Sequence, residues 1–393
     1  MTKISLSTMP VRTKWVYLFG LVITLTASII ELAKGRAENM QVFYYSSQLF
    51  WGNCTALDTS LIPSPYAPSF SEHFGRYFLY TPVFSVLFSV LTLLPLWMAG
   101  LVWNVLNYTL LFFAVKALPL PKDKPMRAML YLMLLTAASA FCFQYNILMT
   151  AMFLGAFILL ERGRGAWAVL LIMVSATTKL FGLFELALLF CYRDTLRNFL
   201  WAILFGAILL ISPALRLGWD GLIPYYGEWL RALTEHNSSM AFNSLLYIHP
   251  FEAWTMTHML EMQLGSLLML ALVFFLKYRS WGDFRFRAGA LAVVMGWICL
   301  LGNATETHTY IIAFAGYILF YYTSPDVRRH PRLNNVLYWG NWLLFGVMPI
   351  DILCPVTVFD LLHKTLWIDI YFYTFTWGYM IYCLVKGDKI LHT

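Results

Sequence analysis

The chain has 393 residues, of which 60% are hydrophobic, 18% are aromatic and only 12% are charged. A soluble domain carries about a quarter charged residues, so this composition excludes an ordinary soluble protein. The formal net charge of +7 does not indicate nucleic-acid binding, because membrane proteins collect Lys and Arg in their cytoplasmic segments.

The first apolar run, WVYLFGLVITLTASIIELA at 15–33, follows a basic start, MTKISLSTMPVRTKW. It is too long for the apolar region of a signal peptide, and no small-residue cleavage site closes it. We therefore predict a signal anchor that is retained as the first membrane span.

Residues 34–96 are predicted to form one large loop on the outer side of the membrane. Its aromatic stretch at 38–59, which Gly52-Asn53 breaks, is typical of an amphipathic element at the headgroup level. The stretch at 78–95 is apolar enough to cross, but crossing would place the basic KALPLPKDKPMR loop outside. We therefore expect an interfacial or re-entrant helix there.

The rest of the chain is predicted to be an all-α polytopic membrane protein, because its apolar runs approach the length of a membrane span. Both termini are placed in the cytoplasm, since this puts most of the 27 Lys and Arg inside. A second large outer loop is expected at 215–263, and residues 1–393 are expected to form a single integral membrane domain. About twelve spans are predicted, near 15–33, 97–116, 126–143, 146–161, 165–179, 180–191, 198–214, 264–278, 287–302, 308–323, 334–350 and 365–385.

Signatures of metal, cofactor and nucleotide sites are absent from the sequence. The six cysteines show no C-x-x-C spacing, and most lie inside apolar runs, where they act as small hydrophobic residues. There is no Walker-type glycine loop, no H-E-x-x-H and no G-x-S-x-G. We predict no metal, no cofactor and no nucleic-acid partner.

Polar residues gather instead at the predicted outer ends of the spans. An ionisable group bordering an apolar run is costly and is a functional candidate by default. The candidates are Glu38, Asn39, Asp58, Tyr80, Gln144, Asn146, Lys179, His236, Glu306 and His308.

Each candidate also has a purely structural interpretation. Lys179 would hold a phosphate or pyrophosphate at membrane depth, or would extend to the interface or pair with Glu185. Gln144 and Asn146 would bind a polar substrate or cap the turn between two spans. Acids such as Glu306 are also favoured at helix starts. Lone histidines such as His308 are more often structural donors than catalysts.

Several segments resemble glycosyltransferase family 87, the polyprenol-phosphate-mannose-type enzymes, and the topology resembles the C superfamily of membrane glycosyltransferases. The resemblance covers most of 15–325. It rests on ENMQVFYYSSQLFWGN, RYFLYTPVFSVLFSVLTLLPLWMAGLVWNVLN, QYNILMTAMFLGAFILLERGRGAWAVLLIMVSATTKLFGLFELALLF, SSMAFNSLL and ETHTYIIAFAGYILFYY.

The resemblance implies a polyprenyl-phosphate sugar donor, a lipid or glycan acceptor, and inverting transfer on the non-cytoplasmic face. It implies a bacterial inner membrane, with the active site on the periplasmic side and membrane lipids as partners. It matches Lys179, Gln144 and Asn146 to family motif positions, and it implies a catalytic Asp where this chain has Asn39.

Asparagine cannot act as a base, so Glu38 is predicted to supply the carboxylate, with Asp58 as the second choice. Two other functions remain open. A lipid-linked-sugar transporter or flippase would need an inverted repeat, which the sequence does not show. A catalytically inactive glycolipid-binding relative is favoured by Asn39.

Overall fold

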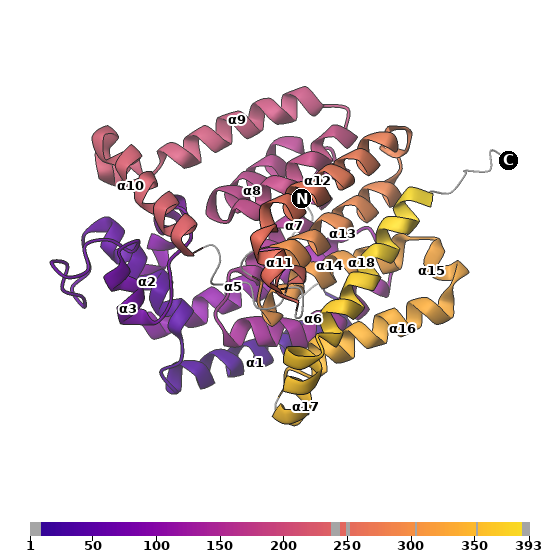
Figure 1. The fold of residues 1–393 in the computed structure, drawn as a ribbon, viewed down its shortest axis with the longest axis horizontal. Coiled ribbons are helices and arrows are strands. Elements are labelled where there is room, and N and C mark those ends of the chain that lie inside the picture. The colour runs from indigo at the N-terminus through magenta and orange to yellow at the C-terminus, as the bar shows by residue number, and fades with distance from the viewer. Residues whose placement is uncertain (1–8, 237–243, 249–251, 303–304, 351–352, 387–393) are drawn as a thin grey trace. The chain divides into compact units, whose positions relative to one another are not determined.

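The computed structural model describes residues 9–236, 244–248, 252–302, 305–350 and 353–386. Every regular element in these ranges is a helix, as the sequence predicts (Figure 1). Backbone contacts divide the chain into two compact units. Unit 1 is Met1–Leu183 with Leu196–His236, and unit 2 is Phe184–Thr195 with Asn237–Thr393. The single integral domain expected from the sequence stays a prediction.

Unit 1 holds the first outer loop and the helices around it. Its elements are α1 (Val11–Ala33), α2 (Glu38–Trp51), α3 (Pro68–Phe74), α4 (Pro82–Phe88), the 3₁₀ turn Ser89–Leu93, α5 (Leu96–Ala117), α6 (Lys124–Phe141), α7 (Asn146–Glu161), α8 (Gly165–Thr178), most of α9 (Thr195–Ile211) and α10 (Ala214–His236). The 3₁₀ segment Leu180–Cys191 links α8 to α9 and spans the boundary between the units.

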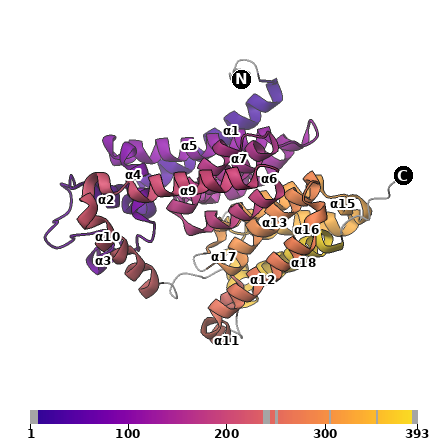
Figure 2. The ribbon, with the colours of Figure 1, turned by 90° about the horizontal axis from the view of Figure 1, so that it is seen from above.

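The core of unit 1 is built by close helix packing. Helix α1 contacts α5 and α6 (Figure 2). Helix α7 contacts α5 and α8. A Cβ atom on Gly20 of α1 would overlap the ring of Tyr108 of α5. The Tyr108 hydroxyl donates a 2.9 Å hydrogen bond to the Tyr17 carbonyl of α1. Small residues allow such approach between apolar helices, where hydrophobic burial gives little driving force.

Unit 2 is organised around α13, which packs against α14 and α18 (Figure 1). Trp377 of α18 donates a 2.9 Å hydrogen bond to the Val293 carbonyl of α13. Its elements are η4 (Leu245–Tyr247), α11 (Glu252–Thr257), α12 (Met259–Leu276), η5 (Tyr278–Ser280), α13 (Phe284–Leu301), η6 (Thr307–Tyr310), α14 (Ile311–Thr323), α15 (Asp326–Arg329), α16 (Pro331–Asn341), the π-helix Trp342–Val347, α17 (Val356–Asp360), the π-helix Leu361–Thr365 and α18 (Ile368–Lys386).

Within the described ranges, four helices are long and apolar enough to cross a membrane: α1, α5, α12 and α13. Helices α9 and α10 would add a fifth span if the 92° bend between them belongs to one crossing. Other predicted spans, such as 146–161, are present as shorter apolar helices. A helix of this length rises only about 24 Å, less than a typical hydrocarbon core. The chain is therefore a helical membrane protein, and the count of about twelve spans stays a prediction.

The predicted loops contain several helices. The stretch at 78–95 forms only α4 and the 3₁₀ turn after it, between Pro82 and Leu93. Twelve helical residues rise about 18 Å, less than a typical hydrocarbon core, and the interfacial or re-entrant position of this stretch stays a prediction. The predicted second outer loop, 215–263, contains most of α10 and all of α11, and α12 begins earlier than expected, at Met259.

Candidate active site

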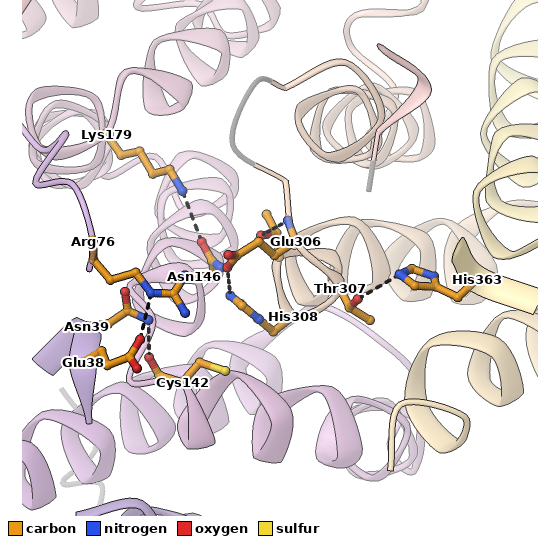
Figure 3. A network of polar contacts seen from close by, with 11 residues as sticks. Glu38, Asn39, Arg76, Cys142, Asn146, Lys179, Glu306, Thr307, His308 and His363 are labelled. Atoms are coloured by element: carbon orange, nitrogen blue, oxygen red, sulfur yellow. Dashed lines mark hydrogen bonds and ion pairs between the residues drawn. The ribbon is translucent and has the colours of Figure 1, made fainter. Parts of the chain in front are cut away.

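Most candidate residues of unit 1 lie at the ends of α2, α4, α6, α7 and α8. Glu38 is the first residue of α2, and its Oε2 accepts a 2.9 Å hydrogen bond from Nε of Arg76 (Figure 3). Both side chains are about half exposed, so this ion pair contributes little to stability. Arg76 is not among the residues that the sequence singles out, because no local pattern connects it with Glu38, 38 residues earlier in the chain.

Asn39 joins α2 to the turn between α6 and α7. Its Nδ2 donates a 2.8 Å hydrogen bond to the carbonyl of Cys142 (Figure 3). A carboxylate at position 39 would have no proton to donate to this carbonyl. Asn39 stands where the resemblance implies an Asp, and its hydrogen bond to the Cys142 carbonyl is one that an ionised Asp could not make.

The turn after α6 has an unusual backbone. Phe143 is fully buried and has a φ of 50°, a left-handed conformation that bulky residues rarely adopt. Its carbonyl accepts a 3.2 Å hydrogen bond from Nε1 of Trp103. Such conformations cost about 1–3 kcal/mol and cluster at functional sites.

Gln144 and Asn146 lie on either side of Tyr145, which precedes α7. The Tyr145 side chain makes no capping hydrogen bond at the start of α7. Instead, the Tyr145 hydroxyl hydrogen-bonds the hydroxyl of Thr178, at the end of α8. Asn146 is almost fully buried at the first position of α7. The capping role of Gln144 and Asn146 stays a prediction.

Lys179 ends α8 in an extended conformation, with φ −139° and ψ 117°. Its Nζ lies 3.5 Å from Oδ1 of Asn146 (Figure 3). It also lies 5.3 Å from the ring centroid of Phe181. Both carboxylate oxygens of Glu185 are buried without a hydrogen-bond partner among the described residues. The alternative, pairing of Lys179 with Glu185, stays a prediction.

Tyr80 lies in an aromatic cluster beside these residues. Its ring centroid is 5.1 Å from that of Phe43, 4.6 Å from that of Phe84 and 5.8 Å from that of Tyr145. The next residue, Thr81, donates a hydrogen bond from its hydroxyl to the carbonyl of Thr177. Asn39, Tyr80, Gln144, Asn146 and Lys179 are thus brought together by contacts between helix ends; we call this group the unit 1 cluster.

Asp58 contacts only nearby residues in the part of the chain that the structure describes. Its Oδ1 accepts hydrogen bonds from the Ser60 hydroxyl at 2.6 Å and the Ser60 backbone N–H at 2.9 Å. These hydrogen bonds, chiefly the one from the hydroxyl, lower the pKa of the fully exposed Asp58 carboxyl. A lowered pKa makes a carboxylate a weaker base.

In unit 2, Glu306 and His308 form a pair at the start of η6, with Oε2 and Nε2 2.6 Å apart (Figure 3). Glu306 also makes a reciprocal capping box with Thr309, so the predicted helix-start role is confirmed. His236 ends α10, and its side chain lies outside the described residues. No group of three or more His, Cys, Asp or Glu suited to a metal ion occurs among the residues described.

These helices, with their polar groups collected at helix ends, define an all-helical membrane protein. The sequence model of glycosyltransferase family 87 matches residues 78–301, more than half of the chain. The chain therefore belongs to glycosyltransferase family 87 and is a glycosyltransferase by family. No curated protein and no solved structure matches it.

The matched range divides the candidates into two sets. Tyr80, Gln144, Asn146, Lys179 and His236 lie inside 78–301. Glu38, Asn39, Asp58, Glu306 and His308 lie outside it, so their roles depend on the geometry of this chain alone.

Proposed function

We propose that this chain transfers a sugar, mannose or a similar hexose, from a polyprenyl-phosphate donor to a lipid or glycan acceptor. The observation that carries the proposal is Lys179, whose ammonium group lies beside the buried Asn146 at the end of an apolar helix. An ammonium group placed there is a charge-assisted donor suited to a phosphate at membrane depth.

The proposed reaction is a single displacement that inverts the anomeric carbon. Glu38 takes the proton of an acceptor hydroxyl, and the oxygen forms a bond to the anomeric carbon. The bond from this carbon to the phosphate oxygen breaks on the opposite face, and the polyprenyl phosphate leaves with the electron pair. Lys179, with Gln144 and Asn146, stabilises the charge that develops on the phosphate. Tyr80, His236, Glu306 and His308 are proposed as further substrate-binding residues.

The proposed orientation places transfer on the outer, periplasmic side of a bacterial inner membrane, in a C-superfamily topology of about twelve spans. Contacts within unit 1 support it, because segments predicted to be cytoplasmic lie together. Arg162 donates a 3.3 Å hydrogen bond to the Ala117 carbonyl, and Gly165 packs closely against Asn198. In unit 2, Arg279, Arg285 and Asp326, also from predicted cytoplasmic segments, line one cavity of about 400 Å³.

The alternative is a relative that binds the glycolipid without transferring its sugar. The specific observation in its favour is Asn39, whose amide is engaged with the Cys142 carbonyl and is not a base. This alternative predicts donor binding that depends on Lys179 but no turnover.

The test supplies the purified protein in lipid nanodiscs with a polyprenyl-phosphate mannose donor whose mannose is radiolabelled. We expect a glycosylated lipid or glycan product and release of polyprenyl phosphate. If the protein binds the donor but forms no product with any lipid or glycan acceptor tried, the result would favour the inactive relative. Absence of donor binding would contradict the proposal.

A further inference from the structure

In unit 2, a series of hydrogen bonds leads to the segment that carries Glu306 and His308. Thr307 lies between these two residues, and its Oγ1 is 3.4 Å from Nε2 of His363 (Figure 3). The other ring nitrogen of His363, Nδ1, is hydrogen-bonded to Oδ2 of Asp369. Residues far apart in the sequence are therefore connected in the order Asp369, His363, Thr307.

His363 and Asp369 are both buried, at 6% and 3% exposure. The second carboxylate oxygen of Asp369, Oδ1, has no hydrogen-bond partner among the described residues. A carboxyl group buried with one oxygen unsatisfied costs folding free energy, so its presence calls for a physical explanation.

The backbone around the pair is also unusual. His363 lies in the π-helix Leu361–Thr365, and π-helical turns occur frequently at functional sites. Trp367, between His363 and Asp369, has a φ of 53°, which is strained for a bulky residue. The His363 ring stacks on Phe359, with centroids 4.7 Å apart and planes 20° apart. The ring is thus fixed in both position and direction.

The two ring nitrogens of His363 have different roles in this series of hydrogen bonds. When Nδ1–H donates to the Asp369 carboxylate, Nε2 carries the lone pair and accepts from the Thr307 hydroxyl. A carboxylate that fixes a histidine tautomer in this way orients whatever the second nitrogen holds. Here the oriented group is the hydroxyl of the residue between Glu306 and His308.

We propose that Asp369 and His363 are positioning residues, which hold Thr307 and thereby keep the Glu306–His308 pair in its working geometry. The inference rests on the proposed function, because it gives that pair a role in sugar transfer. It concerns residues outside 78–301, so the family match assigns them no role. The competing explanation is a buried pair that only stabilises the fold.

The test compares Thr307→Val, His363→Ala and Asp369→Asn with two control variants. Thr307→Val removes only the hydroxyl and keeps the shape of the side chain. Thr365→Val and Asp360→Asn are the controls, because they make the same chemical changes nearby, at an exposed and at a half-exposed position. Thr365 donates to the Asp360 carbonyl, and Asp360 pairs with Lys364.

The first readout does not require activity. It is the rate at which diethyl pyrocarbonate modifies His308, measured by peptide mass spectrometry. Loss of one hydrogen bond should loosen the pair and raise the rate about fivefold in the three variants. The controls should react like the unchanged protein.

The second readout is transfer kinetics. We expect kcat to fall about tenfold with little change in the KM for the donor, since the change affects positioning rather than donor binding. The kcat of the double variant Thr307→Val with His363→Ala should be no lower than that of the slower single variant, because both changes remove the same hydrogen bond.

Wild-type His308 reactivity and kcat in folded Thr307→Val and Asp369→Asn would overturn the proposal and leave the pair a structural one. If Asp369→Asn or His363→Ala does not fold, Thr307→Val decides alone. If the unchanged protein transfers no sugar, the proposed function fails separately, and the His308 reactivity still decides the role of the pair.

Discussion

Lys179 is the residue whose chemistry and position agree best with a phosphate-binding role. Lys179→Ala should lower the rate of transfer roughly ten- to hundredfold, because a charge-assisted contact to phosphate contributes about 1.5–3 kcal/mol. The measurement is initial rate at varied donor concentration. Lys34→Ala, at an exposed lysine of the first loop, is the matched control and should change nothing. Equal rates for the two variants would mean that the Lys179 side chain only extends to the membrane interface and does not bind the phosphate.

Glu38 and Asp58 compete for the role of base, and the two differ in their surroundings. Glu38→Gln should abolish transfer, whereas Asp58→Asn should leave most of it, because Asp58 is engaged in a local turn with Ser60. Product formation by both variants is measured in parallel with Arg76→Ala, which removes the ionic partner of Glu38. The opposite ranking would make Asp58 the base.

Asn39→Asp tests what the amide at this position does. The change should lower the midpoint of thermal unfolding, because the Cys142 carbonyl loses its donor and faces a carboxylate. It should not raise activity, since Glu38 already supplies the base in the proposed mechanism. A gain in transfer by Asn39→Asp would show that the chain has lost its base and would contradict that assignment.

Helix α1 depends on Gly20 for its contact with α5. Gly20→Ala should destabilise the protein by about 1–3 kcal/mol, because the added Cβ would overlap the Tyr108 ring. Gly265→Ala on α12 is the matched control, since a Cβ there meets nothing within 4 Å. Thermal unfolding in detergent compares the two. Equal unfolding midpoints would mean that α1 is not packed against α5 as described.

The orientation proposed for the whole chain follows from the distribution of its basic residues. In a cysteine-free background, Asp58→Cys should react with a membrane-impermeant maleimide added outside intact cells. Arg328→Cys, exposed in a predicted cytoplasmic segment, should react only after the membrane is opened. Labelling of position 58 from the inside alone would reverse the topology and place the first large loop in the cytoplasm.

The sequence alone determined the all-helical membrane class and the family. Apolar runs with few charges show that a segment prefers the membrane to water, and this preference is a local property that needs no tertiary contact. The same reasoning predicts that 78–95 does not cross the membrane, because the basic charge of the following loop constrains it. It also identified Lys179, Gln144 and Asn146, whose polar side chains border apolar runs.

The tertiary structure alone decided which polar groups meet. Arg76 pairs with Glu38, Asn39 bonds the Cys142 carbonyl, and Asp369 and His363 connect to Thr307, across separations that no local pattern encodes. It also decided the helix lengths, because turns such as the one at Phe143 depend on buried contacts. Hydropathy measures how a segment partitions into the membrane, whereas hydrogen bonds between helix ends depend on how those helices pack.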